Sequence, residues 1–291
     1  MVGLGCGSGA LGAGCRRLAR AWSGVSDDGQ VAYVIAQLSD THIGGPHAGS
    51  GERLSMAISE INAMGRPPDL VLLTGDLTHD GTTAQWDEVR SRLAELLPPW
   101  EAIRGNHDHD LPALAGHRTT EAGPLRLVLL DTSREVFTTD DAAWLDDQLR
   151  SDPRPTIVAL HHPPFETGIW WMDSIGLDGQ RRFEDVVRRH AHVLKVLSGH
   201  VHRAIQTQWG SCSLWVGPST AVAVAVDLDP AHAPAESAEP PAFSLHAYTA
   251  GGTIVSHVVP VGPTASRRTI EAPELVERAR GLQRTRRSDL A

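Results

Sequence analysis

Apolar and polar positions along the first two thirds of the chain follow two alternating patterns. Short runs rich in β-branched and aliphatic residues predict strands, and these runs cover 31–38, 69–74, 100–104, 125–130, 156–160 and 193–197. Between the runs, apolar residues recur three or four positions apart and predict amphipathic helices, which cover 54–64, 86–96 and 142–150. Strands and helices that alternate in this way are typical of an α/β layered core.

From residue 204 onward the pattern changes. Strands are predicted over 204–209, 213–216, 221–226, 243–248 and 253–259, with turns and no helical pattern between them. We expect these strands to form a second, mostly antiparallel sheet that packs on the first. A segment rich in Pro and Ala, 229–241, predicts a loop, and 271–287 predicts a surface helix.

Length and charge limit the candidate functions. A chain of 291 residues is long enough for one large domain or two small ones. The net charge of −9 argues against a nucleic-acid partner, because nonspecific phosphate binding requires a basic face. Bound metal ions can still create a local positive field for an anionic substrate. A small phosphate ester therefore fits better than DNA.

Cysteine usage and the N-terminal segment bear on the compartment. The three cysteines, Cys6, Cys15 and Cys212, do not form a disulfide framework, so a reducing cytoplasm is expected. No apolar stretch is long enough to cross a bilayer, so no membrane partner is expected.

Residues 1–30 lack the order of charge and apolar core found in a secretory signal. They predict a flexible leader or a start placed upstream of the true one. A lipid anchor at Cys15 is the less favoured alternative, because no leucine stands three residues before it.

Polar clusters follow several of the predicted strands directly. The five clusters are Asp40-Thr41-His42, Gly75-Asp76, Gly105-Asn106-His107-Asp108, His161-His162-Pro163-Pro164 and Gly199-His200-Val201-His202. Their carboxylate, imidazole and amide groups are metal ligands, and the ends of neighbouring strands can bring such groups to one point. A set this large can hold two divalent ions and indicates metal-assisted hydrolysis of a phosphoester.

Each of the first three clusters can also be explained by an ordinary structural role without metal. Asp40 and His42 can bind one ion together, although such pairs are common in surface loops. Asp76 can bridge two ions about 3.5–4 Å apart, or it can serve as a turn or helix-cap residue. Asn106 offers a neutral oxygen to an ion. His107 can protonate a leaving group or stabilise phosphoryl oxygens, and Asp108 is expected to orient it through a hydrogen bond. A plain polar turn is the alternative for this cluster.

The last two clusters supply imidazoles. One histidine of the pair before Pro163 is expected to bind metal, and we favour His161, which ends the strand, over His162. His200 and His202 lie on the same side of an extended segment and can bind separate neighbouring ions. A single histidine in an apolar stretch is more often part of the core than a ligand. Five clusters in this order at strand ends favour the interpretation of these histidines as metal ligands.

As an ordered set, D-x-H, G-D, G-N-H-D, H-x-P and G-H-x-H resembles the calcineurin-like metallophosphoesterase superfamily over residues 40–202, more than half of the chain. Three further stretches resemble the bacterial class III cyclic nucleotide phosphodiesterases and their glycerophosphodiesterase relatives. They are Phe165-Glu166-Thr167-Gly168, Met172-Asp173 and Pro218-Ser219-Thr220.

The resemblance implies an α/β fold, a four-layer αββα sandwich of two mixed sheets flanked by helices. The domain would cover 31–262, between a flexible leader at 1–30 and a C-terminal tail at 263–291 that contains the predicted helix. The implied ligands of the first ion are Asp40, His42, Asp76 and His202. Those of the second ion are Asp76, Asn106, His161 and His200. His107, and with it Asn106, would contact the substrate phosphate. The implied ions are iron or manganese, with zinc as a further choice.

The expected function is hydrolysis of cyclic nucleotides of the 3′,5′-cAMP type, by attack of a metal-bridging hydroxide on phosphorus. No cysteine or serine in the clusters offers a nucleophile for a covalent intermediate. Hydrolysis of glycerophosphodiesters or other phosphodiesters and phosphomonoesters is the alternative. A non-catalytic scaffold is least favoured, because no ligand is missing. Trp170 and Trp171 can stack on a nucleobase, but a hydrophobic flap or a homodimer contact after Pro164 is slightly favoured.

Overall fold

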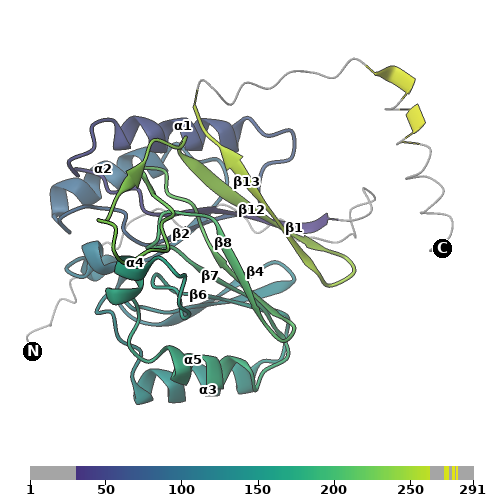
Figure 1. Cartoon of the computed structure of the whole chain (residues 1–291). Helices are drawn as coiled ribbons and strands as arrows, with labels where there is room; N and C mark the ends of the chain where they lie inside the picture. The colour runs from purple at the N-terminus through teal and green to yellow at the C-terminus, as the bar shows by residue number, and fades with distance from the viewer. Residues whose placement is uncertain (1–30, 263–271, 275–276, 279, 281–291) are drawn as a thin grey trace, which may run out of the picture.

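The computed structural model of the chain describes residues 31–262, 272–274, 277–278 and 280. The predicted leader, 1–30, lies outside the described residues, as does most of the predicted tail and its helix. Within the described part, two β-sheets face each other and each carries helices on its outer side (Figure 1). The predicted four-layer αββα sandwich of two mixed sheets is therefore confirmed.

The first sheet has the strand order β13-β12-β1-β2-β3. β1, β2 and β3 are parallel, whereas β12 and β13 run antiparallel to their neighbours. Along β1, Ala36 and Leu38 face the helices, and Ile35 faces the second sheet, as the two-residue period of a strand requires. The strands span Val31–Leu38, Leu70–Thr74, Trp100–Ile103, Ala242–Thr249 and Ile254–Pro260 for β1, β2, β3, β12 and β13.

The second sheet has the strand order β4-β5-β6-β7-β9-β8. β5, β6, β7 and β9 are parallel, and the edge strands β4 and β8 are antiparallel to their neighbours. The strands span Arg118–Ala122, Leu125–Leu129, Thr156–Ala159, Val193–Ser198, Ile205–Trp209 and Cys212–Val216 for β4 to β9. A two-stranded piece, β10 (Ala223–Val224) with β11 (Glu236–Ser237), lies apart from both sheets.

Three apolar clusters hold the layers together. Helices α1 (Ser50–Asn62) and α2 (Thr83–Leu93) pack on the first sheet, and α3 (Thr139–Ser151) and α5 (Gln180–Val187) pack on the second (Figure 1). A third cluster fills the space between the sheets. Burial of apolar area in these three clusters is the main source of stability. None of the helices in the described part of the chain has both the length and the apolar character of a bilayer-spanning segment.

The prediction that the strands after residue 204 form their own antiparallel sheet is wrong. β8 and β9 complete the second sheet, where β9 lies parallel to β7, and β12 and β13 complete the first sheet beside β1. The apolar pattern of a strand reports which face is buried and not which strand is its neighbour. Polar β4 and the short α4 (Trp170–Ser174) lacked a clear pattern and were not predicted. α5 was also not predicted, although its buried Phe183, Val186 and Val187 recur at helical spacing.

Candidate metal centre

Both sheets contribute loops to one end of the sandwich. From the first sheet, Asp40 and His42 follow β1, Asp76 follows β2, and Asn106 with His107 forms a short 3₁₀ turn after β3. From the second sheet, His161 follows β6, and His200 and His202 follow β7. All candidate ligands therefore leave the carboxyl ends of parallel strands, the edge at which α/β sheets place their ligands.

The backbone at these positions is unusual. Within the described residues, six non-glycine residues have a positive φ, and five of these are candidate ligands. The five are Asp40 (53°), His42 (42°), Asp76 (52°), His200 (71°) and His202 (56°). Such conformations cost free energy and persist where the surrounding structure enforces them, commonly at functional sites. The strain is thus concentrated where the side chains must leave the sheet and converge.

Hydrogen bonds between loops hold this conformation. The amide of Asp40 donates to the carbonyl of Gly75 at 3.0 Å, and the amide of His42 donates to the carbonyl of Asp76 at 3.0 Å. Across the sandwich, the amide of His200 donates to Asp40 Oδ1 at 3.0 Å. A carboxylate from one sheet therefore fixes a loop of the other sheet.

One group of candidate ligands consists of Asp40, His42 and His202. The Nε2 atoms of His42 and His202 are 3.0 Å apart, and His202 Nε2 lies 3.6 Å from Asp40 Oδ1. His202 Nδ1 donates to the carbonyl of Val222 at 3.0 Å, so in the neutral ring Nε2 carries the lone pair. Two imidazole nitrogens this close repel each other unless a proton or a cation lies between them. The donor set suits a divalent ion of the borderline class.

A second group is built around His161, whose Nε2 lies 3.3 Å from Asp76 Oδ2. Its Nδ1 donates to the carbonyl of Thr74 at 2.7 Å, the backbone contact that usually orients a metal-binding histidine. Asn106 Oδ1, His161 Nε2 and His200 Nε2 are all buried without a hydrogen-bond partner. Buried polar atoms are rarely left in this state. These residues fit a metal ion that would complete their coordination.

Asp76 lies between the two groups. Its Oδ2 is 3.6 Å from His42 Nε2 as well as 3.3 Å from His161 Nε2. Its Oδ1 accepts a hydrogen bond from the amide of His107 at 3.0 Å. Because it is buried and faces histidines of both sheets, Asp76 is the residue best placed to contact two ions at once.

Burial and charge set the protonation of the cluster. Burial lowers the pKa of His200 to about 3 and holds the pKa of His42 well below its usual range, so both rings are neutral and can donate a lone pair. Burial raises the pKa of Asp40. For His161, burial opposes the charge, but Asp76 outweighs burial and raises the pKa of His161 to about 9, so an ion bound here would displace that proton. His161 in turn holds the pKa of Asp76 well below its usual range against the effect of burial.

His107 is oriented by the backbone and not by Asp108. Its Nδ1 donates to the carbonyl of His79 at 2.6 Å, which leaves Nε2 available. Asp108 is buried and accepts hydrogen bonds from the amides of Leu77 and Thr78 at 3.0 and 2.9 Å. The predicted role of Asp108 in orienting His107 is therefore wrong. The carboxylate instead ties the loop after β3 to the loop after β2.

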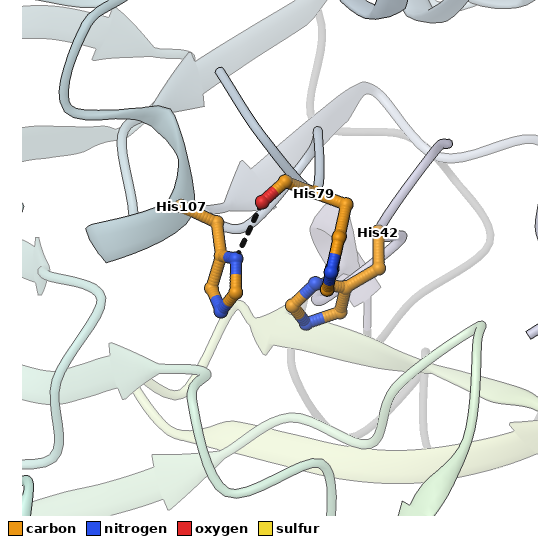
Figure 2. Close-up of side chains that lie close together, drawn as sticks. All are labelled: His42, His79 and His107. Atoms are coloured by element: carbon orange, nitrogen blue, oxygen red, sulfur yellow. Dashed lines mark hydrogen bonds between the residues drawn. The ribbon is translucent and has the colours of Figure 1, made fainter. Parts of the chain in front are cut away.

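Two further histidines lie next to the cluster. His79 was not predicted from the sequence, and His162 was the alternative to His161 as a metal ligand. His79, three residues after Asp76, lies with His42 and His107 (Figure 2). Its position in the same loop as Asp76 was the available signal. His162 is buried beside His161 and His200, and its Nδ1 lies 3.1 Å from Thr132 Oγ1. Of the pair, it is His161 that the structure places next to Asp76.

Removal of the bound ions is expected to lower the melting temperature by roughly 10 °C or more. An ion at 100 times its dissociation constant stabilises the folded state by about 2.7 kcal/mol, and two such ions act together. For a chain of this size, about 1 kcal/mol shifts Tm by about 2–4 °C. Thermal unfolding followed by circular dichroism, with and without a chelator, measures the shift. Added manganese should restore it, and an identical Tm in both samples would contradict a metal centre built from buried ligands.

Comparison with known proteins agrees with this geometry. The family model of calcineurin-like phosphoesterases matches residues 33–204. A probable cyclic nucleotide phosphodiesterase of Synechococcus sp. is 36% identical over 174 residues, which cover 55% of this chain and 68% of the relative. A probable glycerophosphodiester phosphodiesterase of Arcobacter nitrofigilis is 29% identical over 255 residues, which cover 79% of this chain and 93% of the relative.

Among solved structures, a dimetal phosphatase from Danio rerio has a similar fold. The TM-score is 0.56 at 14% identity, and the match covers 80% of this chain and 100% of that protein. The family model spans more than half of the chain and includes every candidate ligand. The chain belongs to the calcineurin-like phosphoesterase family, whose members depend on two metal ions, and it is a metal-dependent phosphoric ester hydrolase.

Proposed function

We propose that this protein is a phosphodiesterase that hydrolyses small phosphodiesters, with 3′,5′-cyclic nucleotides as the preferred class. The observation that carries the proposal is the convergence of oxygen and nitrogen donors from five loops. Three of these donor atoms, Asn106 Oδ1, His161 Nε2 and His200 Nε2, are buried and have no hydrogen-bond partner. The cyclic nucleotide specificity is supported by the name of the Synechococcus relative. The net charge of −9 favours a small substrate over a nucleic acid.

Two ligand sets follow from the two groups of side chains. Asp40, His42 and His202 would hold one ion, and Asn106, His161 and His200 would hold the other. Asp76 would contact both. When bound, such ions neutralise charge on the phosphoryl oxygens and lower the pKa of water. The mixed nitrogen and oxygen ligands suit iron, manganese or zinc, and elemental analysis of the purified protein distinguishes among them.

His107 and Asn106 would act on the substrate. The amide of His107 is held by Asp76 Oδ1 at 3.0 Å and its Nδ1 by the carbonyl of His79 at 2.6 Å, so the ring has a fixed direction. Its Nε2 is then the atom that can hold a phosphoryl oxygen or pass a proton to the leaving group. Side-chain groups held in place before the substrate arrives lower the barrier more than mobile ones.

Hydrolysis of glycerophosphodiesters is the second candidate, because the Arcobacter relative aligns over 93% of its own length. A substrate panel with added manganese separates the two. We expect the highest kcat/KM for cyclic AMP, a lower value for a glycerophosphodiester, and the lowest for a phosphomonoester. Faster hydrolysis of the glycerophosphodiester would reverse the order of the candidates. Absence of turnover on all three, with ions bound, would contradict the proposal.

Of the two tryptophans on α4, Trp170 is the exposed one, so stacking on a nucleobase is proposed for Trp170. It is 37% exposed on α4, and its neighbours Met172 and Asp173 lie close to His200. Trp171 instead packs against the apolar cluster that contains Val201. Stacking of a base on an aromatic ring contributes about 1–3 kcal/mol. Trp170→Ala is therefore expected to lower kcat/KM for cyclic AMP by about tenfold and to spare a small aliphatic diester.

Two variants serve as comparisons for this prediction. Trp171→Ala should reduce turnover of both substrates, because it loosens the loop that carries His200 and His202. Leu97→Ala, at an apolar residue that is 76% exposed between α2 and β3, should change neither. Equal losses on both substrates in Trp170→Ala would count against stacking and favour the flap. Homodimerisation and a cytoplasmic location remain predictions, which light scattering and cell fractionation would test.

A further inference from the structure

His79 completes a third group of imidazoles beside the metal centre. One ring nitrogen from each of His42, His79 and His107 lies within 4.8 Å of those of the other two. The three rings come from the loops after β1, β2 and β3 and lie next to one another (Figure 2). His79 belongs to neither ligand set of the proposed two-ion centre, so this group is an arrangement that the phosphodiesterase reaction does not require.

The ring of His79 is held in place with an unused nitrogen. It stacks on His107 with 5.0 Å between ring centroids and 27° between ring planes. It also packs closely against Gly45, where an added Cβ would lie 3.2 Å from the Nδ1 of His79. That Nδ1 is buried and has no hydrogen-bond partner. The Nδ1 of His42 is also buried and without a partner. Two unsatisfied ring nitrogens in one small region indicate a missing cation or donor.

The chemistry of this third group differs from that of the other two. It has no carboxylate, so it does not suit hard ions that prefer oxygen. Three imidazoles with an open fourth position are a typical site for Zn²⁺, with metal–nitrogen distances of about 2.0–2.1 Å. His107 already has the supporting contact that such ligands need, because its Nδ1 donates to the carbonyl of His79 and its Nε2 is free. The three nitrogens lie within 4.8 Å of one another, and binding of one ion requires the rings to rotate toward it.

We propose that His42, His79 and His107 form an additional, inhibitory site for Zn²⁺. The group shares His42 with the first proposed ion and His107 with the proposed substrate contacts. An ion bound here therefore shares the His42 imidazole with the catalytic centre and occupies the imidazole that faces the substrate. The inhibitory effect rests on the proposed phosphodiesterase function, whereas binding of zinc to the three imidazoles does not.

Zinc content tests the site without reference to activity. His79→Asn and His79→Phe both remove the ring nitrogens and keep the backbone carbonyl that orients His107, and the phenyl ring also keeps the stack. After equilibrium dialysis at a high free zinc concentration, elemental analysis should find one zinc ion fewer per chain in both variants than in the wild type. His257→Asn, which removes an exposed histidine on β13, is the matched control and should bind as much zinc as the wild type.

Inhibition by zinc is the second measurement. With manganese-loaded protein and cyclic AMP as substrate, zinc should inhibit the wild type and His257→Asn. In the two His79 variants the inhibitory zinc concentration should rise by at least about tenfold, since even the loss of a supporting contact costs that much affinity. Equal zinc content in the wild type and both His79 variants would overturn the site. Lower zinc content with unchanged inhibition would overturn its inhibitory role. If the protein hydrolyses no phosphodiester, the zinc content still decides whether the site exists.

Discussion

Asp76→Asn is expected to reduce kcat/KM by about three orders of magnitude, a loss of about 4 kcal/mol of transition-state stabilisation. Asp76 Oδ2 lies between His161 Nε2 at 3.3 Å and His42 Nε2 at 3.6 Å, one histidine from each ligand group. In asparagine the single oxygen can satisfy the amide of His107, but the amino group then faces both imidazoles and cannot bind a cation. The variant therefore loses a negative charge together with the oxygen that is proposed to bridge the ions.

Metal content and steady-state rates measured on the same sample test this expectation. Elemental analysis should find fewer ions bound per chain in Asp76→Asn than in the wild type. Asp87→Asn removes an exposed carboxylate on α2 and should leave both quantities unchanged. Full metal content and full rate in Asp76→Asn would show that this carboxylate does not bridge the ions. Full metal content with a low rate would instead assign Asp76 to catalysis alone.

The location of the candidate ligands could be predicted because the ligand residues come next in the sequence after the strands. Asp40, Asp76 and His161 come directly after buried apolar runs, and parallel strands end at one edge of a sheet. The local sequence was therefore enough to predict each strand and to place the ligand side chain at the end of that strand. The order of the five clusters then made chance an unlikely source of the pattern, although each cluster alone was ambiguous.

Contacts between distant segments could not be predicted in the same way. β9 and β12 read as similar apolar strands, yet β9 pairs with β7 and β12 pairs with β1. Strand pairing depends on tertiary packing, which an apolar pattern does not encode. The contact between the Asp40 carboxylate and the amide of His200 spans 160 positions in the chain and has no local signature. The same holds for the contacts of Asp108 with Leu77 and Thr78, which lie 31 and 30 positions earlier in the chain.

Asp108→Asn is expected to lower the free energy of unfolding by about 3 kcal/mol and Tm by about 10 °C. All partners of this buried carboxylate are donors. Oδ2 accepts from the amides of Leu77 at 3.0 Å and Gly105 at 3.1 Å, and Oδ1 accepts from the amide and hydroxyl of Thr78 at 2.9 and 2.7 Å. Asparagine offers one oxygen, so its amino group must face at least one backbone N–H. Each buried donor left without an acceptor costs about 1–3 kcal/mol.

Unfolding of metal-free protein by heat and by denaturant measures this effect without a contribution from bound ions. Asp110→Asn, two residues later and exposed, is the matched control and should unfold like the wild type. Asp108→Ala should be at least as unstable as Asp108→Asn, because it leaves every donor without an acceptor. If Asp108 instead oriented His107, Asp108→Asn would lower kcat and leave Tm unchanged. That outcome would contradict the hydrogen bonds by which this carboxylate joins the loop of Asp76 to the loop of Asn106.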